Sequence, residues 1–149
     1  MLNEVDGSPF TSGRAGYLGS VPGQPQPRVA RIYVRIQPDG LPGEIAALLD
    51  TGSPWSVLDT SIARELGLFN EPERLLEALS TRIGTVRGRV VTLPVTILAE
   101  AGDSLSIEAA VFVSEEWTEG TFIGFQGLLD HIRFAIDPMA EQFFFGPCA

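Results

Sequence analysis

The residues best suited to chemistry are Asp50, Thr51, Gly52 and Ser53, which directly follow an apolar run at positions 47–49. A carboxylate at the end of a buried strand is costly to desolvate, so it persists where its oxygens accept hydrogen bonds. Thr51 and Ser53 supply hydroxyls, and Gly52 lets the backbone turn so that its N–H can point at the carboxylate. The stretch therefore indicates a supported, reactive carboxylate, with a simple Asp-Gly type of turn as the alternative.

A single carboxylate hydrolyses peptide bonds poorly, whereas two that share a proton do better. The ionised one takes a proton from a bridging water while the protonated one polarises the carbonyl. A second Leu-Asp-Thr occurs nine residues later, at positions 58–60, but no Gly follows it. Asp59 or Thr60 is instead predicted as the N-cap of a short helix over 62–66, with Gly67 just past its end. Asp59 is therefore expected to be structural, which leaves the source of a second catalytic carboxylate open.

The composition is that of one folded, acidic domain. The chain has 149 residues, of which 44% are hydrophobic, and its 16 Gly and 11 Pro favour short strands and many turns over a helix bundle. The net charge is −9, and all ten basic residues are Arg. This balance argues against nucleic acid as a partner, because phosphate binding requires a positive face.

The single Cys, Cys148, and the single His, His131, limit the chemistry further. One Cys cannot form an internal disulfide, and one His with one Cys cannot complete a zinc site of the usual kind within one chain. We expect a free thiol, a structural or surface histidine, and no metal or cofactor. Neither an apolar run of about 18 residues nor a signal-peptide pattern occurs, so the sequence predicts no membrane span and a cytoplasmic protein.

Residues 1–27 are rich in Gly, Ser and Pro and lack periodicity. They are predicted to be a flexible tail or linker in front of a domain over 28–149. Alternating apolar residues then predict a half-buried strand over 29–36, which is followed by a turn. The change of pattern near residue 28 marks the expected start of the domain.

The rest of the domain is predicted to be mainly β. Gly84 and Gly88 are candidate bend points, Gly102 and Asp103 a candidate turn, and 71–79 is either helix or strand. The remaining expected elements are strands over 44–49, 55–58, 93–99 and 104–113, hairpins over 81–93 and 133–145, and a short helix over 127–132.

The sequence resembles the retropepsin-like aspartic proteases of the small, bacterial kind. Three stretches carry the resemblance: ALLDTGS at 47–53, SVLDTSIARELGL at 56–68 and FIGFQGLLDHIRFAID at 122–137. The likeness extends over about residues 29–146, which is most of the chain except the tail. It implies a mainly β, single-lobe acid protease fold with one or two short helices. It also implies a homodimer in which each copy supplies one catalytic Asp50, as befits a chain with one Asp-Thr-Gly.

The resemblance further implies roles for the residues around Asp50. Thr51 would bond across the twofold axis and hold the two loops together, with Gly52 and Ser53 supporting the carboxylate. Gly124, from the apolar-apolar-Gly stretch, would lie under the loop. Pro54 and Trp55 depart from the pattern, since smaller or polar residues are more usual after the motif.

Residues 81–91 would form a flap that closes over an extended peptide and excludes water. Ile83, Gly84 and Thr85 would make its substrate-binding tip. The segment has one clear tip Gly rather than a Gly-rich run. Its arginines are either solvated side chains of a hairpin or a sign of preference for acidic substrates; they are Arg82, Arg87 and Arg89.

The sequence therefore predicts an aspartic endopeptidase that acts as a homodimer on a peptide or protein substrate, through two Asp50 carboxylates that share a proton. The alternative is a catalytically silent module of the same fold that binds a peptide or a protein. A pure binding module has no need of a costly buried carboxylate, which favours the enzyme. A third reading is a domain of a longer protein, in which residues 1–27 are a linker.

Overall fold

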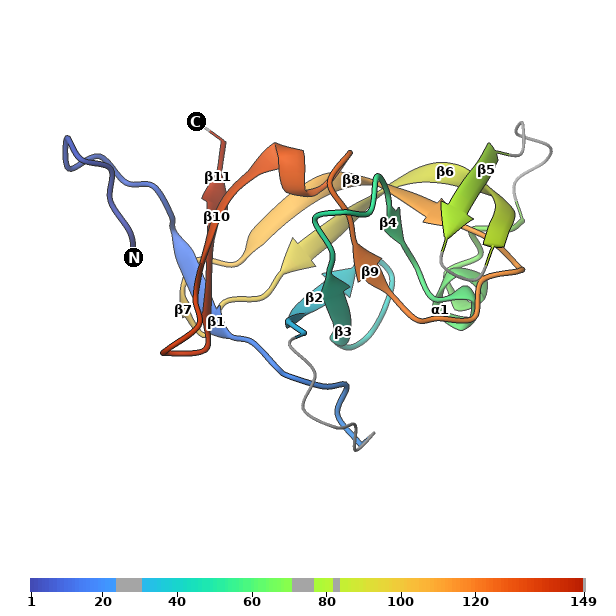
Figure 1. Cartoon of the computed structure of the whole chain (residues 1–149), viewed down its shortest axis with the longest axis horizontal. Coiled ribbons are helices and arrows are strands. Elements are labelled where there is room, and N and C mark those ends of the chain that lie inside the picture. Colours follow the sequence, from blue (N-terminus) through green and yellow to red (C-terminus); the bar gives the residue numbers. More distant parts are fainter. Residues whose placement is uncertain (24–30, 71–76, 82–83, 149) are drawn as a thin grey trace.

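The chain folds as a closed barrel of strands with a second, smaller sheet beside it (Figure 1). The computed structural model describes residues 1–23, 31–70, 77–81 and 84–148. In chain order the elements are β1 (Gly13–Gly16), β2 (Tyr33–Pro38), β3 (Ile45–Leu49), β4 (Ser56–Val57), α1 (Thr60–Glu65), β5 (Glu77–Thr81), β6 (Gly84–Ile97), β7 (Ala101–Gly102), β8 (Leu105–Val113), β9 (Phe122–Ile123), the 3₁₀ helix η1 (Leu129–His131), β10 (Ile132–Asp137) and β11 (Gln142–Pro147). The fold is thus mainly β, as the sequence predicts.

Six strands close into the barrel in the order β2-β3-β9-β4-β8-β6, and β6 pairs back onto β2. The longest pair is antiparallel and joins residues 89–97 of β6 to residues 105–113 of β8. The short strands complete the ring, since β9 lies parallel to β3 and β4 lies parallel to β8. Closure pairs the backbone groups that an open sheet would leave at its edges.

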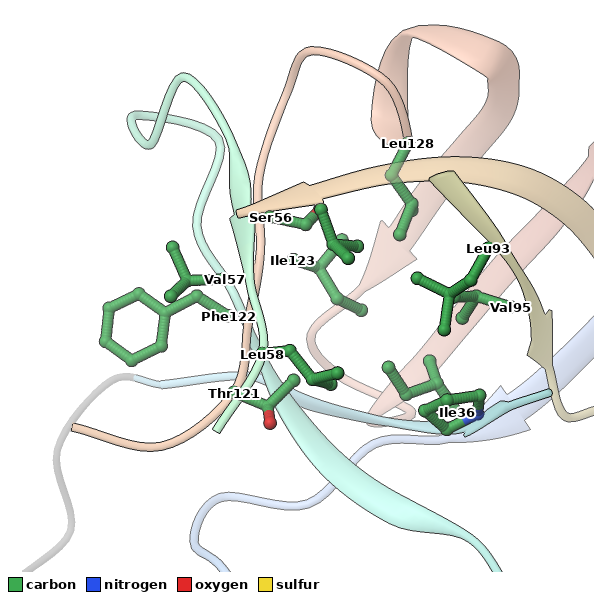
Figure 2. Close-up of a pocket in the computed structure, with 12 residues that line it drawn as sticks. Ile36, Ser56, Val57, Leu58, Leu93, Val95, Thr121, Phe122, Ile123 and Leu128 are labelled. Carbon is green, nitrogen blue, oxygen red and sulfur yellow. The ribbon is translucent and has the colours of Figure 1, made fainter. Parts of the chain in front are cut away.

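The barrel is filled by apolar side chains from alternate strand positions and from the loop before η1. Ile36, Leu93, Val95, Ile123 and Leu128 gather in its interior (Figure 2). The gap that they and their neighbours leave is only about 10 Å³. The barrel interior is therefore a packed core with no room for a ligand.

A second apolar cluster lies on the other side of β4 and β9. Val57 and Phe122 point away from the barrel core (Figure 2), and the rings of Phe122 and Trp117 meet edge to face at 5.4 Å. The buried members of this cluster are Val57, Leu79, Val86, Phe112 and Trp117. Because Leu79 lies on β5 and Val86 on β6, the cluster attaches the β5–β6 hairpin to the barrel.

The smaller sheet has the order β10-β11-β1-β7 and joins early and late parts of the chain. β1 pairs with β11 on one side and with β7 on the other, and Ala15 is buried. At the end of β1, the Glu100 carboxylate accepts hydrogen bonds from the Gly16 N–H (3.1 Å) and from the Arg35 guanidinium (2.6 Å). The Gly16 bond first, and then Arg35, lower the pKa of Glu100.

β1 lies within residues 1–27, which the sequence predicts to be a flexible tail. The structure instead places residues 13–16 in the middle of a sheet. The difference has a physical reason, since the four residues have no periodic pattern of their own and are ordered by backbone pairing with distant strands. The domain boundary at residue 28 stays a prediction.

Asp59 caps helix α1 and Gly67 lies just past its end, as the sequence predicts, although the helix spans residues 60–65 and not 62–66. Asp59 is the N-cap and accepts a hydrogen bond from the Ser61 N–H at 2.9 Å. At the other end Gly67 adopts a φ of 70°, and the Leu68 N–H donates to the Ala63 carbonyl at 3.0 Å. This is the usual glycine termination of a helix. Neither helix in the described part of the chain is long and apolar enough to cross a membrane.

The hairpin predicted over 81–93 lies earlier in the chain. β5 ends at Thr81, and β6 then runs without a break from residue 84 to residue 97, so the strand predicted over 93–99 is mostly part of β6. Gly84 is a bend, with a φ of 113°, and it pairs with Thr81. Of the segment 71–79, residues 77–79 are strand, and residues 71–76 lie outside the described residues.

The bend predicted at Gly88 is wrong. Gly88 lies inside β6 opposite Glu77, and a Cβ atom there would lie 2.2 Å from the Val113 carbonyl oxygen. The glycine thus serves close packing of β6 against β8. Gly102, predicted as part of a turn, instead belongs to β7 and pairs with Gly13, with a φ of 79°.

The docking of β1 makes a testable prediction about Gly13. A Cβ atom at Gly13 would lie 2.2 Å from the Asp103 carbonyl oxygen and 2.7 Å from the Phe145 ring. Gly13→Ala is therefore expected to lower the free energy of unfolding by about 1–3 kcal/mol in urea denaturation. Gly19→Ala is the matched control, because nothing lies within 4 Å of its Cβ position. Equal stabilities of the two variants would mean that β1 is not docked in solution.

Candidate active site

The segment that we call the Asp50 loop, residues 50–55, connects β3 to β4. The Asp50 N–H donates to the Ile123 carbonyl at 2.9 Å, which continues the β3–β9 pairing. The Gly52 N–H donates to Asp50 Oδ1 at 3.0 Å, as the sequence predicts, and the Ser53 N–H donates to the Asp50 carbonyl at 3.1 Å. A Cβ atom at Gly52 would lie 3.3 Å from Oδ1, so a side chain there would crowd the carboxylate.

The two hydroxyl residues of the loop have different surroundings. The Ser53 hydroxyl donates to the Trp55 carbonyl at 2.7 Å, so it stabilises the turn rather than the Asp50 carboxylate. Thr51 is exposed at the surface of the single chain. Its predicted bond across a twofold axis stays a prediction, because the structure holds one copy.

Gly124 lies directly beneath the Asp50 loop. A Cβ atom at Gly124 would lie 2.2 Å from the carbonyl carbon and oxygen of Trp55. Its N–H donates to the Ser56 hydroxyl at 2.9 Å, in a buried hydrogen bond. Two further bonds join the segments, from the Phe125 N–H to the Ser53 carbonyl (2.9 Å) and from the Gln126 N–H to the Pro54 carbonyl (2.8 Å). The loop and the segment after β9 are therefore one rigid unit.

An open groove of about 1370 Å³ runs along the Asp50 loop. Asp50, Gly52, Ser53 and Pro54 line it from the loop, and Leu79, Ser80 and Thr81 line it from β5; further lining residues come from β2 and β3, from the start of α1, and from 117–122 and 21–22. Asp50 is half-buried at this surface. The carboxylate is thus accessible from a groove large enough for an extended peptide.

The predicted flap residues are placed only in part. Gly84 and Thr85 pair with Thr81 and Ser80 across the β5–β6 hairpin, whereas Ile83 lies outside the described residues. The side of the hairpin that lines the groove is β5, not the start of β6. The Thr81 hydroxyl donates to the Gly84 carbonyl at 2.6 Å and so fixes the described ends of the hairpin.

Residues 117–121 line the groove, although the sequence did not single them out. The loop is held by the Trp117 indole, which donates to the Gly120 carbonyl at 2.6 Å. The Thr60 hydroxyl lies within hydrogen-bond distance of the Trp117 carbonyl (2.5 Å) and of the Ser114 carbonyl (2.7 Å), so it fastens the loop to α1. The available signal in the sequence was Trp117 and Gly120, which lie five and two residues before the apolar-apolar-Gly stretch.

The charged side chains that line the groove are mostly acidic. In the described part of the chain these are Arg31, Glu44, Asp50, Asp59 and Glu119. Arg87 is exposed and Arg89 is half-buried, and neither lines the groove; the Arg87 backbone N–H donates to the Glu116 carboxylate at 3.0 Å. Arg82 lies outside the described residues. The described lining therefore gives no support to a preference for acidic substrates.

The lone His and Cys lie apart from the groove lining. His131 is exposed, and its Nε2 lies 3.7 Å from Asp130 Oδ1. Cys148 is an exposed, free thiol. Among the described residues, no three His, Cys, Asp or Glu side chains are grouped so that they could hold a metal ion.

The buried bond beneath the loop makes a testable prediction. Ser56→Ala removes the acceptor of the Gly124 N–H, and an unpaired buried N–H costs about 1–3 kcal/mol. We expect a loss of that size in the free energy of unfolding, together with faster hydrogen exchange at the Gly124 amide. Ser106→Ala, at an exposed position of β8, is the control for the loss of a hydroxyl. An unchanged Gly124 exchange rate would contradict the role assigned to Ser56.

No protein-family model matches this chain, and no curated protein matches its sequence. Among solved structures, the chain is similar to a retropepsin-like aspartic protease from Rickettsia conorii, with 19% identity and a TM-score of 0.57, covering 80% of this chain and 92% of that one. It is also similar to the retroviral protease-like domain of Ddi1 from Leishmania major, with 19% identity and a TM-score of 0.52, covering 81% of this chain and 96% of that one. The chain therefore has the retropepsin-like fold.

Proposed function

We propose that this protein is an aspartic endopeptidase that acts as a homodimer, with one Asp50 from each copy. The observation that carries the proposal is the placement of Asp50. Its carboxylate accepts the Gly52 N–H at the edge of a groove of about 1370 Å³, within a retropepsin-like fold. A carboxylate held in this way and open to a groove is suited to general acid–base chemistry on a bound peptide.

The second carboxylate of the pair is expected from a second copy of the chain. The sequence contains one Asp-Thr-Gly. Asp59, in the second Leu-Asp-Thr, has its Oδ1 occupied by the Ser61 N–H and hydroxyl at the start of α1. A twofold arrangement of two Asp50 loops would bring two carboxylates together, and the exposed Thr51 of each copy would be available for contact.

In this mechanism the two carboxylates hold one proton between them, because like charges about 3 Å apart cannot both be ionised. The ionised carboxylate takes a proton from a water, whose oxygen attacks the peptide carbonyl carbon. The protonated carboxylate donates its proton to the carbonyl oxygen. The tetrahedral gem-diol then collapses: one of its hydroxyls returns a proton to the ionised carboxylate as the carbonyl re-forms, the C–N bond breaks, and the amine nitrogen takes the proton of the other carboxylate. The pair is left with one proton, as at the start.

The groove has features that suit an extended peptide. β5 is the outermost strand of its sheet in the described part of the chain, and three of its residues face the groove. An outer strand presents backbone groups with which an extended peptide can pair. The apolar cluster that contains Leu79 packs β5 against the barrel.

The first test is removal of the carboxylate. Asp50→Asn is expected to lower kcat/KM by at least about a thousandfold on a diverse peptide library at pH 4–7, since a residue of the reacting pair is lost. Asp39→Asn is the matched control, because this exposed carboxylate in the turn after β2 does not line the groove, so both cleavage and stability should stay nearly unchanged. Sedimentation on the same samples relates cleavage to the dimer fraction. A clean monomer with no cleavage at any pH would favour a peptide-binding module.

Mixing the two forms tests whether the carboxylates come from different copies. In an equal mixture of wild type and Asp50→Asn, random exchange leaves roughly one quarter of the dimers with two Asp50. Activity per wild-type chain is then expected to fall by about half, because half of the wild-type chains have a wild-type partner. Activity per wild-type chain that is independent of added variant would contradict a shared site.

The shared proton makes dimerisation dependent on pH. If association takes up a proton, the dissociation constant of the dimer rises with pH by up to about tenfold per unit. The net charge of −9 on each copy acts in the same direction. Asp50→Asn separates the two effects. Two copies of this variant still repel each other through their net negative charge, but they have no Asp50 pair that takes up a proton on association. Equal pH dependence of wild type and variant from pH 4 to 8 would count against proton sharing.

A further inference from the structure

Glu119 is an exposed carboxylate in the loop that lines the groove beside the start of α1. Exposed acidic side chains are ordinary on a protein surface, so the position of this one decides its meaning. Three glutamates lie between β8 and β9, and of Glu115, Glu116 and Glu119 only the last lines the groove that contains Asp50. The Glu116 carboxylate accepts the Arg87 N–H at 3.0 Å, whereas Glu119 has no hydrogen-bond or ion-pair partner among the described residues.

The backbone that carries Glu119 is fixed on both sides. Before it, the Trp117 ring is buried in the second apolar cluster, and the Trp117 indole donates to the Gly120 carbonyl at 2.6 Å. After it, the Thr121 hydroxyl oxygen accepts the Asp59 N–H at 3.1 Å, so the loop runs beside the start of α1 (Figure 1). A charge on a fixed backbone can select a ligand charge at a defined place, because little has to be ordered on binding.

The side of the groove next to Glu119 carries negative charge. Asp59 lines the groove from the start of α1, and the hydrogen bonds that its carboxylate accepts from the described residues all end on Oδ1, which leaves Oδ2 available. The basic residue in the described lining is Arg31, which precedes β2, and β3 separates β2 from β9. Arg64 of α1 does not line the groove. A cationic side chain beside Glu119 would therefore be attracted by two carboxylates, and an anionic one would be repelled.

The chain between Glu119 and Ile123 limits how far this charge lies from Asp50. The Asp50 N–H donates to the Ile123 carbonyl at 2.9 Å, and Glu119 precedes Ile123 by four residues. Four residues of extended chain span at most about 14 Å. A bound peptide in extended form rises about 3.3 Å per residue. A substrate side chain that meets Glu119 is thus expected within about four positions of the bond that Asp50 would cleave.

We infer that Glu119 is a specificity-determining residue, and that this protein prefers peptides with a Lys or Arg within about four positions of the cleaved bond. The inference rests on the proposed function and adds the class of substrate. Each copy of a homodimer brings its own Glu119, so the preference is expected on both sides of the bond. Its sign is opposite to the preference for acidic substrates that arginines of the flap would confer.

The test starts from a library peptide that the wild type cleaves. At each of the four positions on either side of the cleaved bond, a peptide with Lys is compared with a peptide with Gln, and the specificity ratio is kcat/KM for Lys divided by kcat/KM for Gln. We expect a ratio of about three to five at one position or more, which is the size of effect that an exposed ion pair has. Added salt should lower the ratio, because salt screens exposed charges.

Three variants assign the preference to one side chain. Glu119→Gln should bring the ratio close to one and leave kcat/KM for the Gln peptide nearly unchanged. Glu119→Arg should favour a Glu peptide over the Lys peptide. Glu115→Gln is the matched control, because it removes the same charge from an exposed position of the same loop that does not line the groove, and it should keep the wild-type ratio.

Two results of this comparison would overturn the inference and leave the protease standing. One is a ratio that Glu119→Gln does not change. The other is a ratio that Glu115→Gln lowers as much as Glu119→Gln does, since the preference would then come from the net charge of the chain.

Binding separates a failure of this inference from a failure of the proposed function. Asp50→Asn is expected to bind fluorescent Lys and Gln peptides without cleaving them, and fluorescence anisotropy gives both dissociation constants. Suppose that the wild type cleaves no peptide, but that the Lys peptide binds more tightly and loses this advantage when Glu119→Gln is added. The proposed function would then be wrong and the preference would stand. If neither cleavage nor binding distinguishes the two peptides, the inference is wrong.

Discussion

The backbone of Gly124 lies directly against the backbone of Trp55, and the geometry of the candidate site depends on this contact. No side chain fits at position 124, since even a Cβ atom would lie 2.2 Å from the Trp55 carbonyl. The close approach allows three backbone N–H groups, those of residues 124–126, to bond to Ser56, Ser53 and Pro54. These bonds hold a loop whose motif would otherwise be a short turn at the surface. The Asp50 carboxylate is thus oriented by backbone, which has little freedom to move.

The barrel supports this contact from below. β9 lies between β3 and β4, parallel to one and antiparallel to the other, although it has only two residues. Its side chains divide between the two apolar clusters, with Ile123 in the barrel core and Phe122 beside Trp117 (Figure 2). A strand as short as this is held mainly by side-chain packing rather than by its own pairing. The site therefore draws its rigidity from both clusters, and the groove lies over the second of them.

The features that could be predicted from the sequence are those whose determinants are neighbours in the chain. The Gly52 N–H next to the Asp50 carboxylate, the Asp59 cap and the termination at Gly67 each depend on a few adjacent residues. Their chemistry can be read directly from side-chain type and backbone freedom.

The features that could not be predicted depend on distant partners. β1 is a four-residue strand with one buried apolar side chain, so no periodicity marks it. The sequence suggests a bend at Gly88. In the structure only glycine fits at this position, because β6 packs closely on β8. The groove wall at 117–121 is a loop without a motif, and it lines the groove because Thr60 and its own Trp117 fix its course. Local pattern carries no record of such long-range contacts.

The smaller sheet also sets the order in which the chain can become structured. Arg14 on β1 and Gln142 on β11 are hydrogen-bonded at 3.0 Å but lie 128 residues apart. Contacts across such a separation carry a high loop-closure entropy and form late in folding. The six barrel strands pair with one another, so their pairing does not require β10 or β11. β1 lies near the start of the chain, but it can pair with β11 only after the last strand of the chain is present. We therefore expect the barrel to become ordered before the smaller sheet.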